Sequence, residues 1–265
     1  MKKVFLSVAL AAAALISVPA QAVSVSFNYT NTNVSGGDQS GKTSPLLSAN
    51  NVATSGSGVF VETFSALNGG GNSQGCGLDT PAGLVSITGG SYGFRQGSTT
   101  GAAAPAGDST CFAYGPAIGG KLPDEVNINY SGLISTLGGG SSLNYLGLYY
   151  GSIDTYNDLI FYDADGNVIT TITGTSLIAL FKGTSGNKTS DSSNIYVNLF
   201  FSPDEQFTSF SFKTTGIAFE MDNVVVGFNV SAIPEPGSVA LLGLGLAALG
   251  VTRRRKTQTQ TETQA

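Results

Sequence analysis

Residues 145–162 read YLGLYYGSIDTYNDLIFY, two runs of aromatic and aliphatic side chains separated by a polar turn. Short runs of this kind, bounded by Gly, Ser, Asp or Asn, are typical of β-strands. The pattern recurs on both sides of this stretch. Strands are expected at residues 126–130, 145–150, 158–162, 168–173, 177–181, 194–200, 209–214 and 217–230. No segment between them has room for a crossover helix, so we expect the strands to pair in antiparallel fashion.

The rest of the chain also favours an all-β fold. Its 36 glycines, together with many Ser, Thr and Asn residues, indicate turns between short strands. Residues 23–30 and 58–64 add two apolar strands. Residues 31–57 are polar and have no lasting period, which predicts a long loop or a loosely attached arm. The predicted fold is an antiparallel β-sandwich.

A pair of glycines, Gly89 and Gly90, separates the apolar runs at residues 84–88 and 91–95. Two-residue connections with glycine suit the positive φ angles of tight hairpin turns. The sequence therefore predicts a hairpin formed by these two runs.

The sequence DADGN at residues 163–167 carries oxygen-bearing side chains at alternate positions around a glycine, like the start of an EF-hand loop. Position 12 of such a loop falls on Gly174, where a bidentate acid is required. A hairpin turn between residues 159–162 and 168–173 is therefore the favoured interpretation.

The N-terminus has the three parts of a secretory signal peptide. Two lysines precede an apolar run at residues 4–18, and an A-x-A cleavage box occupies residues 20–22. We expect the Sec machinery to export the chain, residues 1–22 to be removed and the mature protein to begin at Val23.

The C-terminal segment also has three parts. They are the motif Pro234, Glu235 and Pro236, the uncharged run 237–252, and the basic cluster Arg253, Arg254, Arg255 and Lys256. The prolines fix φ and end any preceding strand. The uncharged run predicts a single hydrophobic helix of about 24 Å, a short membrane span. The basic cluster is expected to stop transfer and stay in the cytoplasm, followed by a polar tail at residues 257–265.

This C-terminal arrangement resembles the PEP-CTERM sorting signal of Gram-negative exosortase substrates. The resemblance implies that a membrane-embedded exosortase recognises Pro234, Glu235 and Pro236, cuts near them, and releases or re-anchors the protein on its way to the cell surface. The inner membrane would then hold the chain only transiently. An ordinary C-terminal tail anchor is the alternative.

The order of motifs over residues 115–230 also resembles the jelly-roll ectodomains of some PEP-CTERM surface proteins. This second resemblance implies a jelly-roll-like sandwich within an ectodomain at residues 23–232, with the sorting signal at residues 233–256.

Charge and composition exclude several functions. Residues 23–233 contain six basic and fifteen acidic residues, a net charge of −9, which repels nucleic acid and anionic lipid. The chain has no histidine, which excludes Ser-His-Asp and Cys-His catalysis and every histidine-based metal site.

The two cysteines, Cys76 and Cys111, belong to a chain with an export signal. Because exported proteins fold in an oxidising compartment, a disulfide between them is expected. It would stabilise the fold by about 3–4 kcal/mol through loop closure. A metal site needs more thiolates or imidazoles than the chain has, and a lone reactive thiol would leave the second cysteine unexplained.

Two further sites are hypotheses. A structural calcium ion could be held by Asp154 and Asp222, because jelly-roll modules often carry one such ion. Sugar rings could stack on Tyr150 and Tyr156, which lie beside a predicted turn. Packing of these tyrosines in the core is the alternative.

The sequence thus predicts an exported non-enzymatic surface or extracellular-matrix protein, processed by exosortase and associated with exopolysaccharide or biofilm. One alternative is a carbohydrate-binding module stabilised by calcium. A second is a carbohydrate-active hydrolase, which would need two carboxylates about 5–10 Å apart.

Overall fold

Fourteen β-strands and two short helices make up the described part of the computed structural model, residues 23–32, 38–54, 56–137 and 142–229. The strands before residue 120 are β1 (Ser24–Ser26), β2 (Thr30–Asn31), β3 (Lys42–Thr43), β4 (Val59–Glu62), β5 (Ser86–Gly89), β6 (Gly93–Gln96) and β7 (Cys111–Gly115). The later strands are β8 (Asp124–Asn129), β9 (Tyr145–Gly151), β10 (Asn157–Tyr162), β11 (Val168–Thr173), β12 (Ile195–Phe200), β13 (Ser209–Thr214) and β14 (Phe219–Gly227). The helices are α1 (Ser131–Thr136) and α2 (Gly174–Phe181).

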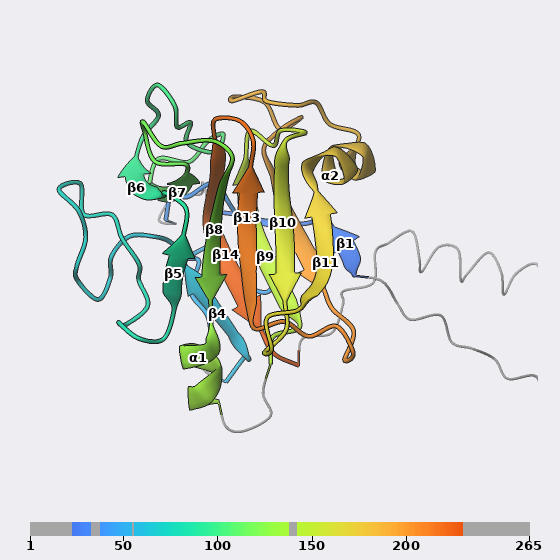
Figure 1. Ribbon diagram of the computed structural model, residues 1–265. Helices are drawn as coiled ribbons and strands as arrows, with labels where there is room; N and C mark the ends of the chain where they lie inside the picture. Colours follow the sequence, from blue (N-terminus) through green and yellow to red (C-terminus); the bar gives the residue numbers. More distant parts are fainter. Residues whose placement is uncertain (1–22, 33–37, 55, 138–141, 230–265) are drawn as a thin grey trace, which may run out of the picture.

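Two antiparallel sheets pack face to face (Figure 1). The seven-stranded sheet has the order β1-β12-β9-β14-β7-β6, with β4 beside the second half of β14. The five-stranded sheet has the order β11-β10-β13-β8-β5, and β2 and β3 form a separate two-stranded ribbon. The predicted all-β antiparallel sandwich is confirmed.

An aromatic core fills the space between the two sheets. Phe212 of β13 lies 4.8 Å from Phe219 of β14, measured between ring centroids, and Phe219 lies 4.4 Å from Tyr150 of β9. These rings face one another because alternate residues of a strand point to the same side of its sheet. Their burial provides the main stabilising contribution to the sandwich.

The strand predicted at residues 177–181 is wrong, because this segment belongs to helix α2. The Thr173 hydroxyl accepts a hydrogen bond from the Ser176 amide and caps the helix N-terminus. Lys182 ends the helix in the left-handed conformation. A short apolar run cannot be assigned to strand or helix by hydrophobicity alone, and here the cap decides.

The hairpin predicted at Gly89 and Gly90 is also wrong. Strand β5 before the glycines pairs with β8 in the five-stranded sheet, whereas β6 after them pairs with β7 in the seven-stranded sheet. The chain therefore crosses from one sheet to the other here. The Gly90 amide donates to the Glu125 carbonyl over 2.7 Å, which guides this crossing.

Residues 38–54 are a packed cover and not a loosely attached arm, and the run predicted as one strand at residues 23–30 divides into β1 and β2. Asn223 of β14 donates to the carbonyls of Ser40 and Lys42 over 2.9 and 2.8 Å, and accepts from Asn51 over 2.6 Å. All these contacts lie on the outer face of the seven-stranded sheet. The polar composition of the segment thus reflects a buried polar interface.

Candidate functional site

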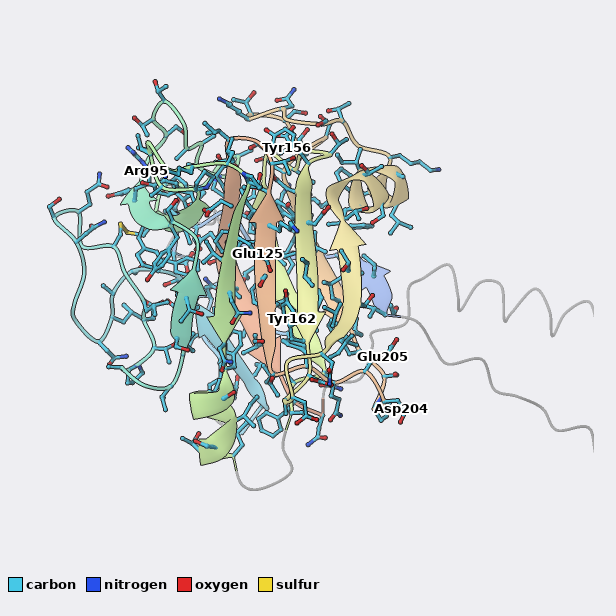
Figure 2. All side chains as sticks on the ribbon, in the orientation of Figure 1. Arg95, Glu125, Tyr156, Tyr162, Asp204 and Glu205 are labelled. Carbon is cyan, nitrogen blue, oxygen red and sulfur yellow. A yellow bond between two sulfur atoms is a disulfide. The ribbon has the colours of Figure 1, made fainter. Side chains whose placement is uncertain are left out.

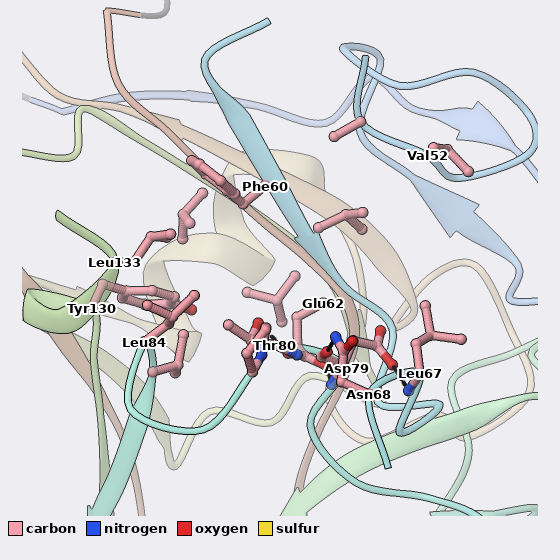
Figure 3. Close-up of a pocket in the computed structure, with 16 residues that line it drawn as sticks. Val52, Phe60, Glu62, Leu67, Asn68, Asp79, Thr80, Leu84, Tyr130 and Leu133 are labelled. Carbon is pink, nitrogen blue, oxygen red and sulfur yellow. Dashed lines mark hydrogen bonds between the residues drawn. The ribbon is translucent and has the colours of Figure 1, made fainter. Parts of the chain in front are cut away.

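A pocket of about 410 Å³ opens at one side of the sandwich, between β4, α1 and the loop at residues 66–85 (Figure 3). Its apolar walls come from Val52, Ala53, Phe60, Val61, Leu67, Pro81, Leu84, Val85, Leu133, Val224 and Val226. The polar residues Glu62, Asn68, Asp79, Thr80 and Tyr130 complete the lining. A pocket of this size is large enough for a small ligand or a sugar unit.

Glu62 anchors the loop that forms the pocket floor. Its Oε1 accepts from the amides of Phe64 and Asp79, over 3.1 and 2.6 Å. Its Oε2 accepts from the amide and hydroxyl of Thr80, over 3.2 and 2.9 Å. Burial raises the pKa of the Glu62 carboxyl to about 7, despite these donors. Both carboxylate oxygens of Glu62 are therefore occupied by hydrogen bonds from the protein.

Asp79, the second acid of the pocket, has a similar role. Its Oδ2 accepts from the amide and hydroxyl of Thr63, both over 2.6 Å, and its Oδ1 accepts from the Leu67 amide over 3.2 Å. A general acid or nucleophile needs an oxygen that can reach substrate. The hydrogen bonds of Glu62 and Asp79 therefore support a structural role for both acids.

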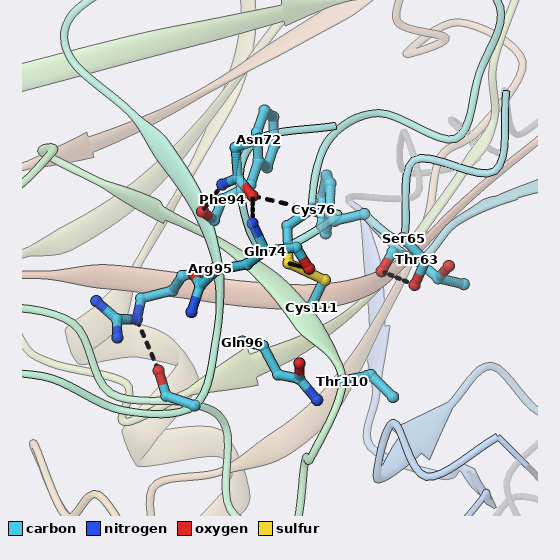
Figure 4. Close-up of a disulfide and its surroundings, with 12 residues drawn as sticks. Thr63, Ser65, Asn72, Gln74, Cys76, Phe94, Arg95, Gln96, Thr110 and Cys111 are labelled. Atoms are coloured by element: carbon cyan, nitrogen blue, oxygen red, sulfur yellow. Dashed lines mark hydrogen bonds between the residues drawn. A yellow bond between two sulfur atoms is a disulfide. The ribbon is translucent and has the colours of Figure 1, made fainter. Parts of the chain in front are cut away.

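The predicted disulfide is confirmed. Cys76 and Cys111 are bonded, with 5.6 Å between their Cα atoms (Figure 4). The bond joins the loop after β4 to the first residue of β7. Next to it, Asn72 orders the loop, because its side-chain oxygen accepts from the amides of Gln74 and Cys76 over 2.9 and 3.1 Å. This cross-link fixes a loop that has little regular structure of its own.

The expected exposure of Tyr150 is wrong, because its side chain is 0% exposed and stacks on Phe219 in the core. Tyr156 is partly exposed at one end of the sandwich (Figure 2). Its hydroxyl donates to Asp154 over 2.6 Å, and its ring lies over Gly216. A sugar contact at Tyr156 stays a prediction, whereas Tyr150 cannot reach a ligand in this fold.

The two acids predicted to share a calcium ion have different partners. Asp154 accepts from the hydroxyls of Tyr156 and Ser185, near the end of the sandwich. Asp222 is fully buried on β14 and lies near Thr110 and Asp108. A joint site of Asp154 and Asp222 stays a prediction. The acid that lies beside Asp222 is Asp108.

The segment 163–167 is a hairpin turn, as favoured from the sequence. It joins β10 to β11, and Gly166 takes a positive φ of 82°. The Asp163 carboxylate accepts from the amides of Asp165 and Asn167 over 2.9 and 2.8 Å. The Asn167 side-chain amide donates to the same carboxylate over 2.9 Å, and this bond, followed by the backbone bonds, lowers the pKa of the Asp163 carboxyl.

The outer face of the five-stranded sheet carries a row of polar side chains (Figure 2). The Tyr162 hydroxyl of β10 donates to Glu125 of β8 over 2.8 Å, and Lys213 of β13 lies 3.8 Å from the same carboxylate. Asn127 donates to the Ser211 hydroxyl over 3.3 Å. This face combines one aromatic ring with hydroxyl, amide and charged groups. Strand alternation in the sequence could have placed Tyr162 and Glu125 here.

The sorting residues lie outside the described part of the chain. They are Pro234, Glu235 and Pro236 with Arg253, Arg254, Arg255 and Lys256. The signal peptide and the predicted C-terminal helix lie there as well. Within the residues that are described, neither helix has the length and apolar character needed to cross a bilayer.

Comparison with protein families finds the PEP-CTERM protein-sorting motif at residues 232–256. The residues expected to be recognised and those expected to stop transfer all fall inside this match. No curated protein matches the chain.

The solved structures to which this chain is similar share little sequence with it. The K2 cleaved adhesin domain of Lys-gingipain is 13% identical, covers 66% of this chain and 100% of its own, and has a TM-score of 0.35. The C-terminal family 22 carbohydrate-binding module of Clostridium thermocellum Xyn10B is 9% identical, covers 66% and 96%, and has a TM-score of 0.32. The lectin-binding domain of Lectinolysin, a His 62 mutant complexed with Lewis b, is 10% identical, covers 54% and 93%, and has a TM-score of 0.29.

Proposed function

We propose that this chain is a non-catalytic exported protein that exosortase-dependent sorting delivers to the cell surface or to extracellular polysaccharide. It would work there as a structural or adhesive component of the surface or biofilm. The observation that carries this proposal is the sorting motif at residues 232–256.

Two features of the folded domain support this proposal of a non-catalytic exported protein. The Cys76–Cys111 bond requires an oxidising compartment. The acids in the side pocket, Glu62 and Asp79, hold backbone amides, which favours a non-catalytic role over the alternative of a hydrolase.

Deletion of Pro234–Pro236 in the producing cell tests the sorting proposal. We expect the wild-type protein to reach the surface fraction with a mass reduced at its C-terminus, and the deletion variant to keep its C-terminus and stay with the inner membrane. A three-residue deletion in the polar tail, at residues 258–260, is the matched control. Identical C-terminal processing of the wild type and the motif deletion, measured by mass spectrometry, would contradict the proposal.

Carbohydrate binding is a second candidate, favoured by the open face of the five-stranded sheet. The ring of Tyr162 is partly exposed and could stack on a sugar, and Glu125 and Lys213 provide hydrogen-bonding groups beside it. Sites that bind sugars commonly combine an apolar surface with a few placed polar groups. This face lies on a different sheet from the pocket wall formed by β4 and β14.

A pull-down with the producer's own exopolysaccharide tests this candidate. We expect Tyr162→Ala to reduce retention several-fold, while Tyr92→Ala serves as the control at an exposed tyrosine near the other sheet. Tyr156→Ala reports separately on the sugar contact predicted from the sequence. No retention of the wild type would remove carbohydrate binding and leave the sorting proposal unaffected.

A further inference from the structure

The hydroxyl of Tyr130 is a polar group of the side pocket that lacks a partner. Tyr130 is 4% exposed and lines the pocket of about 410 Å³ between β4, α1 and the loop at residues 66–85. Its ring stacks on Phe210 of β13, with 6.2 Å between ring centroids. Within the described part of the chain its backbone amide donates to the Thr208 carbonyl, but its hydroxyl makes no hydrogen bond. Because buried hydroxyls are normally paired, this one indicates a group that enters the pocket from outside.

The Tyr130 hydroxyl stays neutral and keeps its proton. Burial raises the pKa of Tyr130, and the nearby Glu62 carboxyl raises it further. The side chain belongs to the pocket wall that also contains Leu84 and Leu133 (Figure 3). This apolar wall therefore carries one group that can donate a hydrogen bond to a ligand.

The charges of the pocket favour a neutral ligand. Among the residues that are described, no lysine or arginine lines it, so an anion would meet the carboxyls of Glu62 and Asp79 without a compensating cation. Glu62 already accepts four hydrogen bonds and Asp79 three, all from the chain around the pocket floor. A cationic ligand would have to compete with these donors.

The walls favour an apolar ligand over a sugar. Eleven of the sixteen lining residues are apolar, so water inside the pocket finds few polar partners and its release by an apolar molecule is favourable. A sugar carries many hydroxyl groups, which would lose hydrogen bonds to water that these walls cannot replace. The pocket thus suits an apolar molecule with a single polar group.

We propose that the side pocket binds a neutral, mainly apolar small molecule whose oxygen atom accepts a hydrogen bond from the Tyr130 hydroxyl. Aromatic and aliphatic alcohols and esters belong to this class. Neither the sorting motif nor Tyr162 is part of this site, so the inference does not depend on the proposed function. It adds a ligand-binding activity to the exported domain.

Three aromatic molecules with the same ring system test this proposal: naphthalene, naphthol and naphthoate. Each is titrated into the exported protein at neutral pH and followed by calorimetry. We expect naphthol to bind with one-to-one stoichiometry and about fivefold more tightly than naphthalene, because it gains one hydrogen bond. Naphthoate is an anion at neutral pH and should not bind.

Two variants locate the site. Tyr130→Phe removes only the unpartnered hydroxyl, so it should fold normally, bind naphthalene as the wild type does, and bind naphthol no more tightly than naphthalene. Ala53→Phe places a ring at a partly buried lining position and should abolish binding of both neutral molecules. Ala104→Phe is the matched control at a partly buried alanine outside the pocket. Tyr162→Ala should also leave naphthol binding unchanged.

Several outcomes would overturn the proposal. If neither naphthalene nor naphthol binds the wild type, water is the partner of the Tyr130 hydroxyl and the pocket has no ligand of this class. If naphthoate binds as tightly as naphthol, the ligand is not selected for neutrality. A preference for naphthol that persists in Tyr130→Phe would exclude the Tyr130 hydroxyl as the donor.

Discussion

The two sheets differ in what covers their outer faces. On the seven-stranded sheet, residues 38–54 and the loop at residues 97–110 cover β9 and β14, and every residue of these two strands is buried. On the five-stranded sheet, β8 and β10 carry partly exposed residues on the outer face, whereas β13 between them is buried except at Lys213. One face is a buried polar layer, and the other is partly open to solvent along β8 and β10.

This difference changes what a polar side chain does. Glu220 of β14 points to the same side of its strand as Asp222, and its oxygens accept from the Ala103 amide and the Ser152 hydroxyl, both over 2.9 Å. Glu125 on the open face interacts with groups that water also reaches. Polar residues on the covered face are therefore held by buried hydrogen bonds, whereas those on the open face make bonds with which water can compete.

Two asparagines, one on each outer face, provide the sharpest contrast. Asn223→Ala should lower the free energy of unfolding by about 4 kcal/mol, because two buried carbonyls and the Asn51 amide each lose a hydrogen bond. Asn127→Ala should cost less than about 0.5 kcal/mol, as expected for a surface position. Urea unfolding at 25 °C measures both. Equal losses of unfolding free energy in the two variants would contradict the difference between the two outer faces.

Removal of the disulfide should weaken one side of the molecule more than the other. Cys76→Ala with Cys111→Ala should cost about 3–4 kcal/mol, because the unfolded chain gains the freedom of the opened loop. Hydrogen exchange should then rise in β7 and in the loop at residues 97–110, while β10 and β11 keep their protection. Uniform loss of protection in both sheets would contradict this expectation.

The pH dependence of stability should contain a contribution from Glu220 on the covered face. Burial raises the pKa of Glu220 to about 8, from 4.5. The folded state then keeps a proton that the unfolded state loses, so stability is greatest below about pH 4.5 and falls as the pH rises to about 8. The slope from this one group is at most about 1.4 kcal/mol per pH unit. Glu220→Gln should flatten the curve, as measured by unfolding between pH 5 and 9.

Glu125→Gln is the control for the titration, because Glu125 is partly exposed to solvent on the open face. A flattening of the same size in this variant would show that Glu220 is not the responsible group.

Two tyrosine hydroxyls give the smallest expected effect. Tyr145 lies on the covered face, where its hydroxyl is 2.6 Å from Asn198 Oδ1 and 2.7 Å from Ser44 Oγ. Tyr145→Phe should cost about 1–2 kcal/mol. Tyr162→Phe should cost less than about 0.5 kcal/mol, because water can replace its bond to Glu125. A larger loss in Tyr162→Phe would mean that the open face also contributes substantially to stability.

Strand alternation accounts for what the sequence could predict. The phenylalanines of β13 recur at every second position and point to the core, and β10 is a short run of apolar residues bounded by a polar turn, so both strands could be predicted. Helix α2 was missed because its eight residues are as apolar as a strand, and only the Thr173 cap distinguishes them.

Contacts between distant segments account for what the sequence could not predict. Asp108 and Asp222 meet only because β7 and β14 are neighbours in the sheet, and no local pattern records that pairing. The same is true of residues 38–54, whose buried partners Tyr149 and Asn223 come from β9 and β14. Tyr150 was misplaced because the face of β9 toward the core could not be separated from its other face by residue type.

The position of β14 within its sheet limits how the chain can be cut near Pro234–Pro236. In the proposed export, β14 would be the last of the described strands to leave the translocation channel, yet it lies in the middle of its sheet, hydrogen-bonded to β9 on one side and to β7 and β4 on the other. It ends at Gly227, and even a fully extended chain reaches Pro234 within about 25 Å. Under the proposed sorting, an enzyme embedded in the bilayer would therefore cut close to the surface of the folded sandwich, or before β14 is in place.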